Sequence, residues 1–437
     1  MLSSKIFAAR RQAVLDRMQV GQAMLLMGAH HPLRNGDAEY RFRQHSDLIY
    51  LSGWSDPEAA LLLVKGAEER FVLFIQPKDP EREVWTGRRA GTEGALADFG
   101  ADAAFDIAKL KAELGKRLIG VRELFYAAGH DAGHDTLVMG ALAAVRRKAR
   151  DAGDVLPDAF IHPGRILHEL RLHKSEEEVA TLRRAGEITT EAHHAAMAAA
   201  TKGMPEYELE ALVDYTFRRR GGNGPGYTTI VGAGDNANIL HYIEGRDPMG
   251  ADDLVLIDAG CELDFYTADV TRTFPVSGRF TPAQKEVYSV VLEAQYAAIE
   301  ACRVGNTFND VHQTAVRVLT QGMLDLGLLE GKLERLIQDK SYKRYYMHGT
   351  SHWLGMDVHD VGSYVADGGS RPLEPGMVLT VEPGLYIPAD DEQAPRRLRG
   401  IGVRIEDDIL VTSAGPDNLT EGCVKEIPDV ERVCQGG

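Results

Sequence analysis

The sequence has few of the features that mark a secreted, membrane-spanning or nucleic-acid-binding protein. It contains only four cysteines in 437 residues and no C-x-x-C pair, which argues against a disulfide framework or a zinc ribbon and suits a reducing compartment. No apolar run approaches the roughly 20 residues that a membrane-spanning helix needs. Lys and Arg number 49 against 65 Asp and Glu, and the net charge of −16 disfavours a nucleic-acid partner. We therefore expect a cytoplasmic globular protein with no nucleic-acid and no membrane partner.

Two regions differ in their pattern. In the first region the short apolar runs 23–27 (AMLLM), 60–64 (ALLLV) and 71–75 (FVLFI) are bounded by turn residues, which is typical of buried strands. The stretch 140–150 is helical in pattern and basic. This mixture predicts an α/β domain over residues 1–172.

The second region, 173–437, opens with a strong helix signal. Ser175 and Glu178 form a capping box, in which the hydroxyl and the carboxylate satisfy free N–H groups of the first helical turn. Thr281 and Gln284 form another box, with Pro282 at the first helical position. We expect the first helix to end at Gly203 and the second to end at Gly305.

Carboxylates end the apolar runs of the second region. Asp258 ends the run 254–257, and Glu382 ends a run within 379–384 (LTVEPG). A second carboxylate follows each one, Asp269 in the stretch 268–274 and Glu406 in the strand-like stretch 403–410. A duplicated half-domain would produce this faint repeat.

A carboxylate at the end of a buried run is costly unless it is paired or binds a metal. Each of these four, taken singly, is better explained as a strand cap or as the partner of an arginine. Four of them together with His352, which lies in the run 348–355 (HGTSHWLG), favour a divalent metal pair. Oxygen-rich ligands with one imidazole suit Mn²⁺, Co²⁺, Fe²⁺ or Zn²⁺ better than copper, and composition does not choose among them. Two such ions can lower the pKa of a water from 15.7 toward about 7 and polarise a scissile carbonyl.

Four motifs carry a resemblance to a known family. The stretches 255–274 (VLIDAGCELDFYTADVTRTF), 348–362 (HGTSHWLGMDVHDVG), 373–387 (LEPGMVLTVEPGLYI) and 400–412 (GIGVRIEDDILVT) resemble the pita-bread metallopeptidases, most closely the aminopeptidase P family. The stretches 238–242 (NILHY) and 41–59 (RFRQHSDLIYLSGWSDPEA) are similar to it as well. The resemblance implies an α+β protein with a C-terminal pita-bread domain and a smaller, creatinase-like α/β N-terminal domain.

The same resemblance implies an activity and a set of site residues. It implies removal of an N-terminal residue from peptides whose second residue is proline, by two divalent ions that are most often Mn²⁺. The implied metal ligands are Asp258, Asp269, His352, Glu382 and Glu406, of which Asp269 and Glu406 bridge the ions. Implied catalytic residues are His241, His348, His359 and Glu382, and implied substrate-binding residues are Tyr386 and Arg404. The family is often dimeric or tetrameric and places the segment of Trp85 near the active site of another subunit, so we expect a homo-oligomer.

Four alternatives remain open at this stage. Prolidase shares the fold and the five ligands but cuts dipeptides, and methionine aminopeptidase shares only the C-terminal fold. A metal-free scaffold, or a metal-independent hydrolase of the creatinase type, is disfavoured because no ligand type is missing.

Other patterns have plainer explanations. Residues 232–237 (GAGDNA) resemble a dinucleotide-binding loop, but 238–242 looks strand-like where that motif needs a helix, so we expect a turn. His193 and His194 lie on a predicted helix without a partner motif, and we interpret them as structural. His30, His31 and His45 are predicted to be ordinary surface or core histidines.

Overall fold

The computed structural model describes residues 2–436, so Met1 and Gly437, the outer ends of the two predicted domains, lie outside the described residues. The chain divides into two compact units, residues 1–170 and 171–437. Helices and mainly antiparallel sheets are combined in the chain, which confirms the predicted α+β class. Every helix within residues 2–436 is too short or too polar to span a bilayer.

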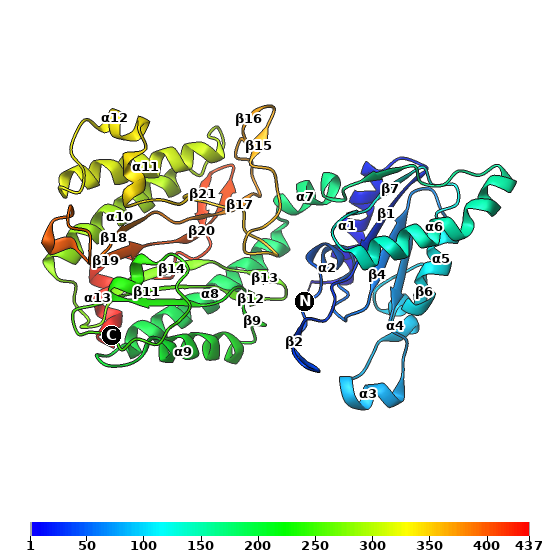
Figure 1. The fold of residues 1–437 in the computed structure, drawn as a ribbon, viewed down its shortest axis with the longest axis horizontal. Helices are drawn as coiled ribbons and strands as arrows, with labels where there is room; N and C mark the ends of the chain where they lie inside the picture. Colours follow the sequence, from blue (N-terminus) through cyan, green and yellow to red (C-terminus); the bar gives the residue numbers. More distant parts are fainter. Residues whose placement is uncertain (1, 437) are drawn as a thin grey trace. The chain divides into compact units, whose positions relative to one another are not determined.

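The first unit is built on one six-stranded mixed sheet with the order β6-β5-β4-β1-β7-β8 (Figure 1). The three predicted strands are confirmed as β1, β4 and β5, and every residue of β4 and β5 is buried. Strand β1 is antiparallel to β4 and parallel to β7. The strands are β1 (Gln22–Met27), β2 (Leu33–Asn35), β3 (Ala38–Glu39), β4 (Ala60–Val64), β5 (Phe71–Ile75), β6 (Ala103–Asp106), β7 (Glu123–Phe125) and β8 (Ala159–Ile161).

Helices cover the sheet of the first unit with small and branched apolar side chains. Leu114 of α5 and Leu142 of α6 belong to the same buried cluster as Leu62 of β4 and Leu124 of β7. The predicted helix at 140–150 lies inside α6. The helices are α1 (Ser4–Arg17), α2 (Ser46–Ser52), α3 (Pro80–Thr86), α4 (Gly91–Ala97), α5 (Leu110–Arg117), α6 (Ala132–Ala152) and α7 (Gly164–Leu172), the last of which ends in the second unit.

Both predicted capping boxes start long helices in the second unit. Ser175 and Glu178 cap α8, and Thr281 and Gln284 cap α10, each with both reciprocal hydrogen bonds present. Both helices end a few residues before the glycines expected to stop them. The helices are α8 (Glu176–Ala199), α9 (Glu206–Arg219), α10 (Pro282–Ala301), α11 (Phe308–Asp325), α12 (Leu333–Gln338) and α13 (Ile427–Cys434).

Two three-stranded antiparallel sheets, β10-β11-β14 and β17-β20-β21, correspond to the faint sequence repeat. In Figure 1, helices α8 and α9 lie on one side of β11 and β14, and α10 and α11 lie on the other. One buried cluster joins them through Ile188, Leu209, Val255, Val287 and Leu319. The strands are β9 (Gly224–Pro225), β10 (Ile230–Ala233), β11 (Leu254–Ala259), β12 (Cys261–Leu263), β13 (Tyr266–Thr267), β14 (Val270–Pro275), β15 (Val365–Ala366), β16 (Gly369–Ser370), β17 (Val378–Val381), β18 (Gly384–Ile387), β19 (Ile401–Arg404), β20 (Asp407–Thr412) and β21 (Gly415–Asn418).

Two local predictions were wrong. The stretch 403–410 is not one strand, because residues 405 and 406 interrupt it between β19, which pairs with β18, and β20, which pairs with β17. Residues 238–242 are not a strand either: Asn238 ends a short 3₁₀ helix (Gly234–Asn238), and an irregular segment follows. In both places tertiary contacts override local propensity.

Candidate metal centre

The internal repeat positions the four carboxylates. Asp258 lies near the end of β11 and is paired with Thr271 of the antiparallel strand β14, while Asp269 directly precedes β14. In the second sheet, Glu382 directly follows β17 and Glu406 directly precedes β20. Because β17 and β20 are antiparallel, the end of the first lies beside the start of the second. Each sheet therefore brings two carboxylates to one edge.

All five predicted ligands meet at one cavity in the second unit. Its volume is about 340 Å³, and it is lined by Tyr227, Thr228, Ile230, His241, Ile243, Asp258, Asp269, His352, Val358, His359, Glu382 and Glu406. Ligand-type atoms of Asp269, His352 and Glu406 lie within 4.8 Å of one another. Residues from four separate stretches of chain thus converge, as a metal centre requires.

The imidazole of His352 is oriented by its neighbours. Its Nδ1 lies 3.1 Å from the carbonyl oxygen of Trp353, to which it can donate a hydrogen bond. Its Nε2 faces Asp269 Oδ2 at 3.3 Å and Glu382 Oε1 at 3.9 Å. A ring that donates from Nδ1 to a carbonyl keeps the lone pair of Nε2 free for a metal.

Burial dominates the electrostatics of the carboxylates. It raises the pKa of Asp269, raises the pKa of Glu382 to about 8, and raises that of Glu406 well above its usual value. Burial also opposes the protonation of His352, but hydrogen bonding to Asp269 and the nearby negative charges raise its pKa to about 9. Carboxylates so close together resist ionising at the same time. A divalent cation would stabilise the ionised forms, so the donor set fits metal binding.

Asp258 is held by two further side chains. Nη2 of Arg404 donates to its Oδ2 at 2.6 Å, and the hydroxyl of Tyr227 donates to its Oδ1 at 2.7 Å. The same hydroxyl contacts Asp269. Tyr227 was not among the predicted site residues, and its only sequence signal is a position shortly before the buried run 230–233.

A smaller cavity of about 200 Å³ adjoins the first and shares His241, Asp258 and Glu382 with it. Its other lining residues are Leu240, His348, Gly349, Ser351 and Arg404. Nε2 of His348 lies 2.8 Å from the hydroxyl of Tyr386, which accepts a 3.1 Å hydrogen bond from Nη1 of Arg404. Burial and the positive charge of Arg404 lower the pKa of His348 to about 3, so this ring is neutral near pH 7.

The remaining predicted residue, His359, lines the larger cavity. Its ring lies edge-on to that of His352, with 4.4 Å between the ring centroids. Burial and the neighbouring His352 lower the pKa of His359. A neutral imidazole at this wall can donate one hydrogen bond into the cavity.

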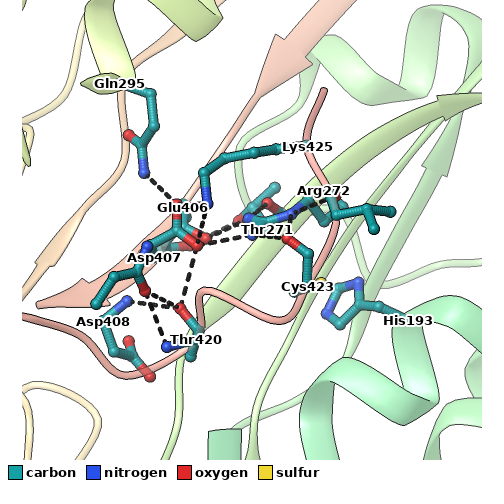
Figure 2. Close-up of polar contacts among 12 residues, drawn as sticks. His193, Thr271, Arg272, Gln295, Glu406, Asp407, Asp408, Thr420, Cys423 and Lys425 are labelled. Atoms are coloured by element: carbon teal, nitrogen blue, oxygen red, sulfur yellow. Dashed lines mark hydrogen bonds and ion pairs between the residues drawn. The ribbon is translucent and has the colours of Figure 1, made fainter. Parts of the chain in front are cut away.

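A second layer of buried charge supports the ligands (Figure 2). Nη2 of Arg272 contacts Asp407 Oδ1 at 2.7 Å, and its Nη1 donates to the backbone carbonyl of Glu406 at 2.6 Å. Asp408 Oδ2 accepts a 3.1 Å hydrogen bond from the backbone N–H of Asp269. Both proposed bridging ligands are therefore anchored through their main chain. Sequence reasoning missed these residues, although charged side chains inside apolar strands were a usable signal.

The histidines interpreted as structural lie outside the cavities. His193 has no exposed surface, and its Nε2 lies 3.3 Å from the carbonyl oxygen of Ala259. Nε2 of His194 accepts a hydrogen bond from the N–H of Val424 at 3.2 Å. His193 thus supports the residue after Asp258 without reaching the carboxylates.

Comparisons with known proteins agree with this geometry. Residues 180–413 match the model of metallopeptidase family M24, and residues 7–126 match that of the aminopeptidase P N-terminal domain. The chain is 45% identical over 432 residues to an Xaa-Pro aminopeptidase of Escherichia coli, covering 98% of this chain and 97% of that protein. It is 42% identical over 433 residues to an Xaa-Pro aminopeptidase of Haemophilus influenzae, covering 99% and 97%.

Solved structures are similar along the whole chain. The aminopeptidase PepP of Pseudomonas aeruginosa matches with a TM-score of 0.98 at 44% identity, covering 100% of this chain and 98% of that one. A zinc-substituted aminopeptidase P of E. coli in complex with product matches with a TM-score of 0.96 at 44% identity, covering 100% and 99%. Both domains therefore have counterparts in these proteins.

Proposed function

The chain belongs to metallopeptidase family M24, and from this premise we propose how its second unit performs an Xaa-Pro aminopeptidase reaction. The enzyme removes the N-terminal residue of a peptide whose second residue is proline, as the names of its full-length relatives state for those proteins. The likeness to aminopeptidase P structures assigns the pita-bread fold. The observation that carries the proposal is the convergence of four carboxylates and one imidazole on one cavity.

We assign the metal ligands to Asp258, Asp269, His352, Glu382 and Glu406. They would hold two divalent ions, with Asp269 and Glu406 shared between them, and Mn²⁺ is the favoured metal over Co²⁺, Zn²⁺ and Fe²⁺. Support comes from the oxygen-rich donor set with one imidazole. When bound, the ions supply an activated water and polarise the scissile carbonyl.

Glu382 is assigned the proton transfers. Its carboxylate lines both cavities, so it lies between the proposed metal centre and the smaller cavity, where a general acid and base can reach both sides of the scissile bond. Its oxygens face both His352 and Nδ1 of His348, the latter at 3.6 Å. Glu382 would accept a proton from the attacking water and deliver it to the departing proline nitrogen.

The smaller cavity is assigned to the proline side of the substrate. An Xaa-Pro bond has no N–H to donate, so its recognition depends on the shape of the ring. His241 and His348 line this cavity and offer flat faces for that ring. Tyr386 would contribute to binding by holding His348, and Arg404 holds Tyr386 in place. His359 lies at the wall of the larger cavity, where it would donate to the oxyanion that forms on the scissile carbonyl.

A peptidase assay after metal removal tests the proposal. The chelated protein is reloaded with one ion at a time and assayed on an Xaa-Pro-Xaa tripeptide and on the matching Xaa-Pro dipeptide. We expect activity to return with Mn²⁺ and to be far higher on the tripeptide. A preference for the dipeptide would identify a prolidase, and full activity without any ion would exclude the metal mechanism.

Three further features belong to this proposal. We assign residues 1–172 to the N-terminal domain and 173–437 to the catalytic domain. A cytoplasmic location is supported by the fact that all four cysteines are free.

We also propose a homo-oligomer, a dimer or a tetramer, because Trp85 of α3 is 87% exposed and a subunit interface would cover it. Sedimentation of the full chain and of Trp85→Ala would test this.

A further inference from the structure

A second group of metal-binding side chains lies in the first unit, within the segment that follows β1 and at the start of α6. His30 follows β1, Asp131 caps the N-terminus of α6, and His134 is the third residue of that helix. One nitrogen or oxygen of each lies within 4.8 Å of the others. Sequence analysis predicts His30 to be an ordinary histidine. The structure gives it partners about a hundred residues away in the chain.

The spacing of these atoms is that of ligands around one small ion. Nε2 of His30 lies 3.2 Å from Oδ2 of Asp131, and Nδ1 of His134 lies 3.7 Å from Oδ1 of the same carboxylate. In a tetrahedral zinc site with bonds of about 2.0–2.1 Å, neighbouring ligand atoms are roughly 3.3 Å apart. The rings of His30 and His134 are stacked with centroids 4.5 Å apart. The exposed ring of His30 would have to turn about its side-chain bonds for both nitrogens to point at one ion.

Each oxygen of the Asp131 carboxylate has a hydrogen-bonding partner and keeps a second lone pair that an ion can use. Oδ1 accepts a 2.7 Å hydrogen bond from the N–H of His134, which is its capping role. Oδ2 is directed to His30. The positive end of the helix dipole opposes a cation here. The negative charges of Asp131 at the N-cap and of Asp135 in the first turn of α6 offset it.

We propose that His30, Asp131 and His134 form a zinc-binding site, separate from the metal centre of the second unit. Two imidazoles and one carboxylate leave at least one coordination position for water, and imidazole favours Zn²⁺ over Mn²⁺. The ion would link the segment after β1 to the N-terminus of α6 within the first unit. Its role is to fasten that segment, and it takes no part in peptide hydrolysis.

Exposure makes the site both accessible and easy to alter. The side chain of His30 is 69% exposed, that of Asp131 is 30% exposed and that of His134 is 19% exposed. Removing the ring of His30 therefore leaves no cavity in the core. Asp131→Asn keeps an oxygen that can cap α6 but removes the charge that the ion needs.

The test is a count of zinc ions per chain. Full-length protein is stripped with a chelator, reloaded with Zn²⁺, passed over a desalting column and analysed for metal and protein. The variants are His30→Ala and Asp131→Asn. The matched control is the double variant His162→Ala, His168→Ala, which removes two neighbouring rings, 5.6 Å apart, from the same unit.

We expect wild type and the control to hold one more Zn²⁺ than His30→Ala, and Asp131→Asn to bind that ion at least about tenfold more weakly. Reloading with Mn²⁺ should give the same metal content in all four proteins, and the Mn²⁺-dependent peptidase activity of His30→Ala should equal that of wild type. Equal zinc content in wild type and His30→Ala would overturn the proposal and leave only a hydrogen-bonded surface cluster. That result would not affect the assignment of the metal centre.

Discussion

The guanidinium of Arg272 lies 2.7 Å from the carboxylate of Asp407, and neither side chain has any exposed surface. Lys425 lies 3.2 Å from the same carboxylate, and Gln295 donates to it at 2.8 Å. One anion therefore pairs with two buried cations beside the candidate metal centre. Asp407 directly follows Glu406, so the pair links the stability of the second unit to the position of a proposed ligand.

Asp407→Asn should destabilise the second unit strongly. The amide keeps the shape of the side chain but leaves Arg272 and Lys425 without a buried counter-charge. Breaking a buried ion pair in this way costs about 3–5 kcal/mol. We expect a decrease of that size in the free energy of unfolding measured with urea.

Asp417→Asn is the matched control for that measurement. Asp417 pairs with Arg183 at 2.7 Å, but both side chains are 41% exposed. Solvent screens such pairs, which contribute about 0–1 kcal/mol. Equal effects of the two substitutions would show that the charge of Asp407 is not needed.

Asp269→Asn should abolish peptidase activity while the protein remains folded. An amide has nearly the volume of the carboxylate but lacks the negative charge that a shared ligand supplies to two ions. Metal content, circular dichroism and turnover of the tripeptide are measured on the same sample. Near-normal turnover with full metal loading would contradict the bridging role of Asp269.

His359→Ala should lower kcat more than it raises KM. The ring lies at the wall of the larger cavity, where a donor is needed mainly when charge develops on the scissile carbonyl. A group that acts only in the transition state affects kcat and kcat/KM about equally. A rise in KM with unchanged kcat would instead identify His359 as a residue that binds the ground state.

Local signals explain which features could be predicted. The capping boxes at Ser175 and Thr281 depend on residues three apart, and both were confirmed. The positions of Asp258 and Glu382 at the ends of apolar runs were also readable, since a buried charge needs a partner. The identity of the family came from long motifs and not from these physical signals.

Features that depend on distant residues could not be predicted. Arg272 and Asp407 are 135 residues apart in the chain, and only the fold pairs them. The break between β19 and β20 arises because the two strands pair with different neighbours. His30 and Asp131 likewise meet only because β1 and α6 are packed in one unit. In each case local propensity carried no information about the partner.

His193 should make a contribution to the stability of the second unit that decreases as the pH falls. Burial lowers its pKa to about 4, whereas an exposed histidine has a pKa of about 6.5. Because the folded-state pKa is the lower one, the unfolded chain binds the proton first. The contribution is therefore complete above about pH 6.5 and is lost as the pH falls from there toward 4.

His193→Gln should remove this dependence, because glutamine can donate to the carbonyl of Ala259 but does not titrate. Between about pH 7.5 and pH 5 we expect wild type to lose on the order of 2 kcal/mol more unfolding free energy than the variant does. Urea unfolding of the metal-free proteins at both pH values measures the difference. His130→Gln, at an exposed position, serves as the control and should follow wild type. Equal losses in wild type and His193→Gln would show that burial does not lower the pKa of His193.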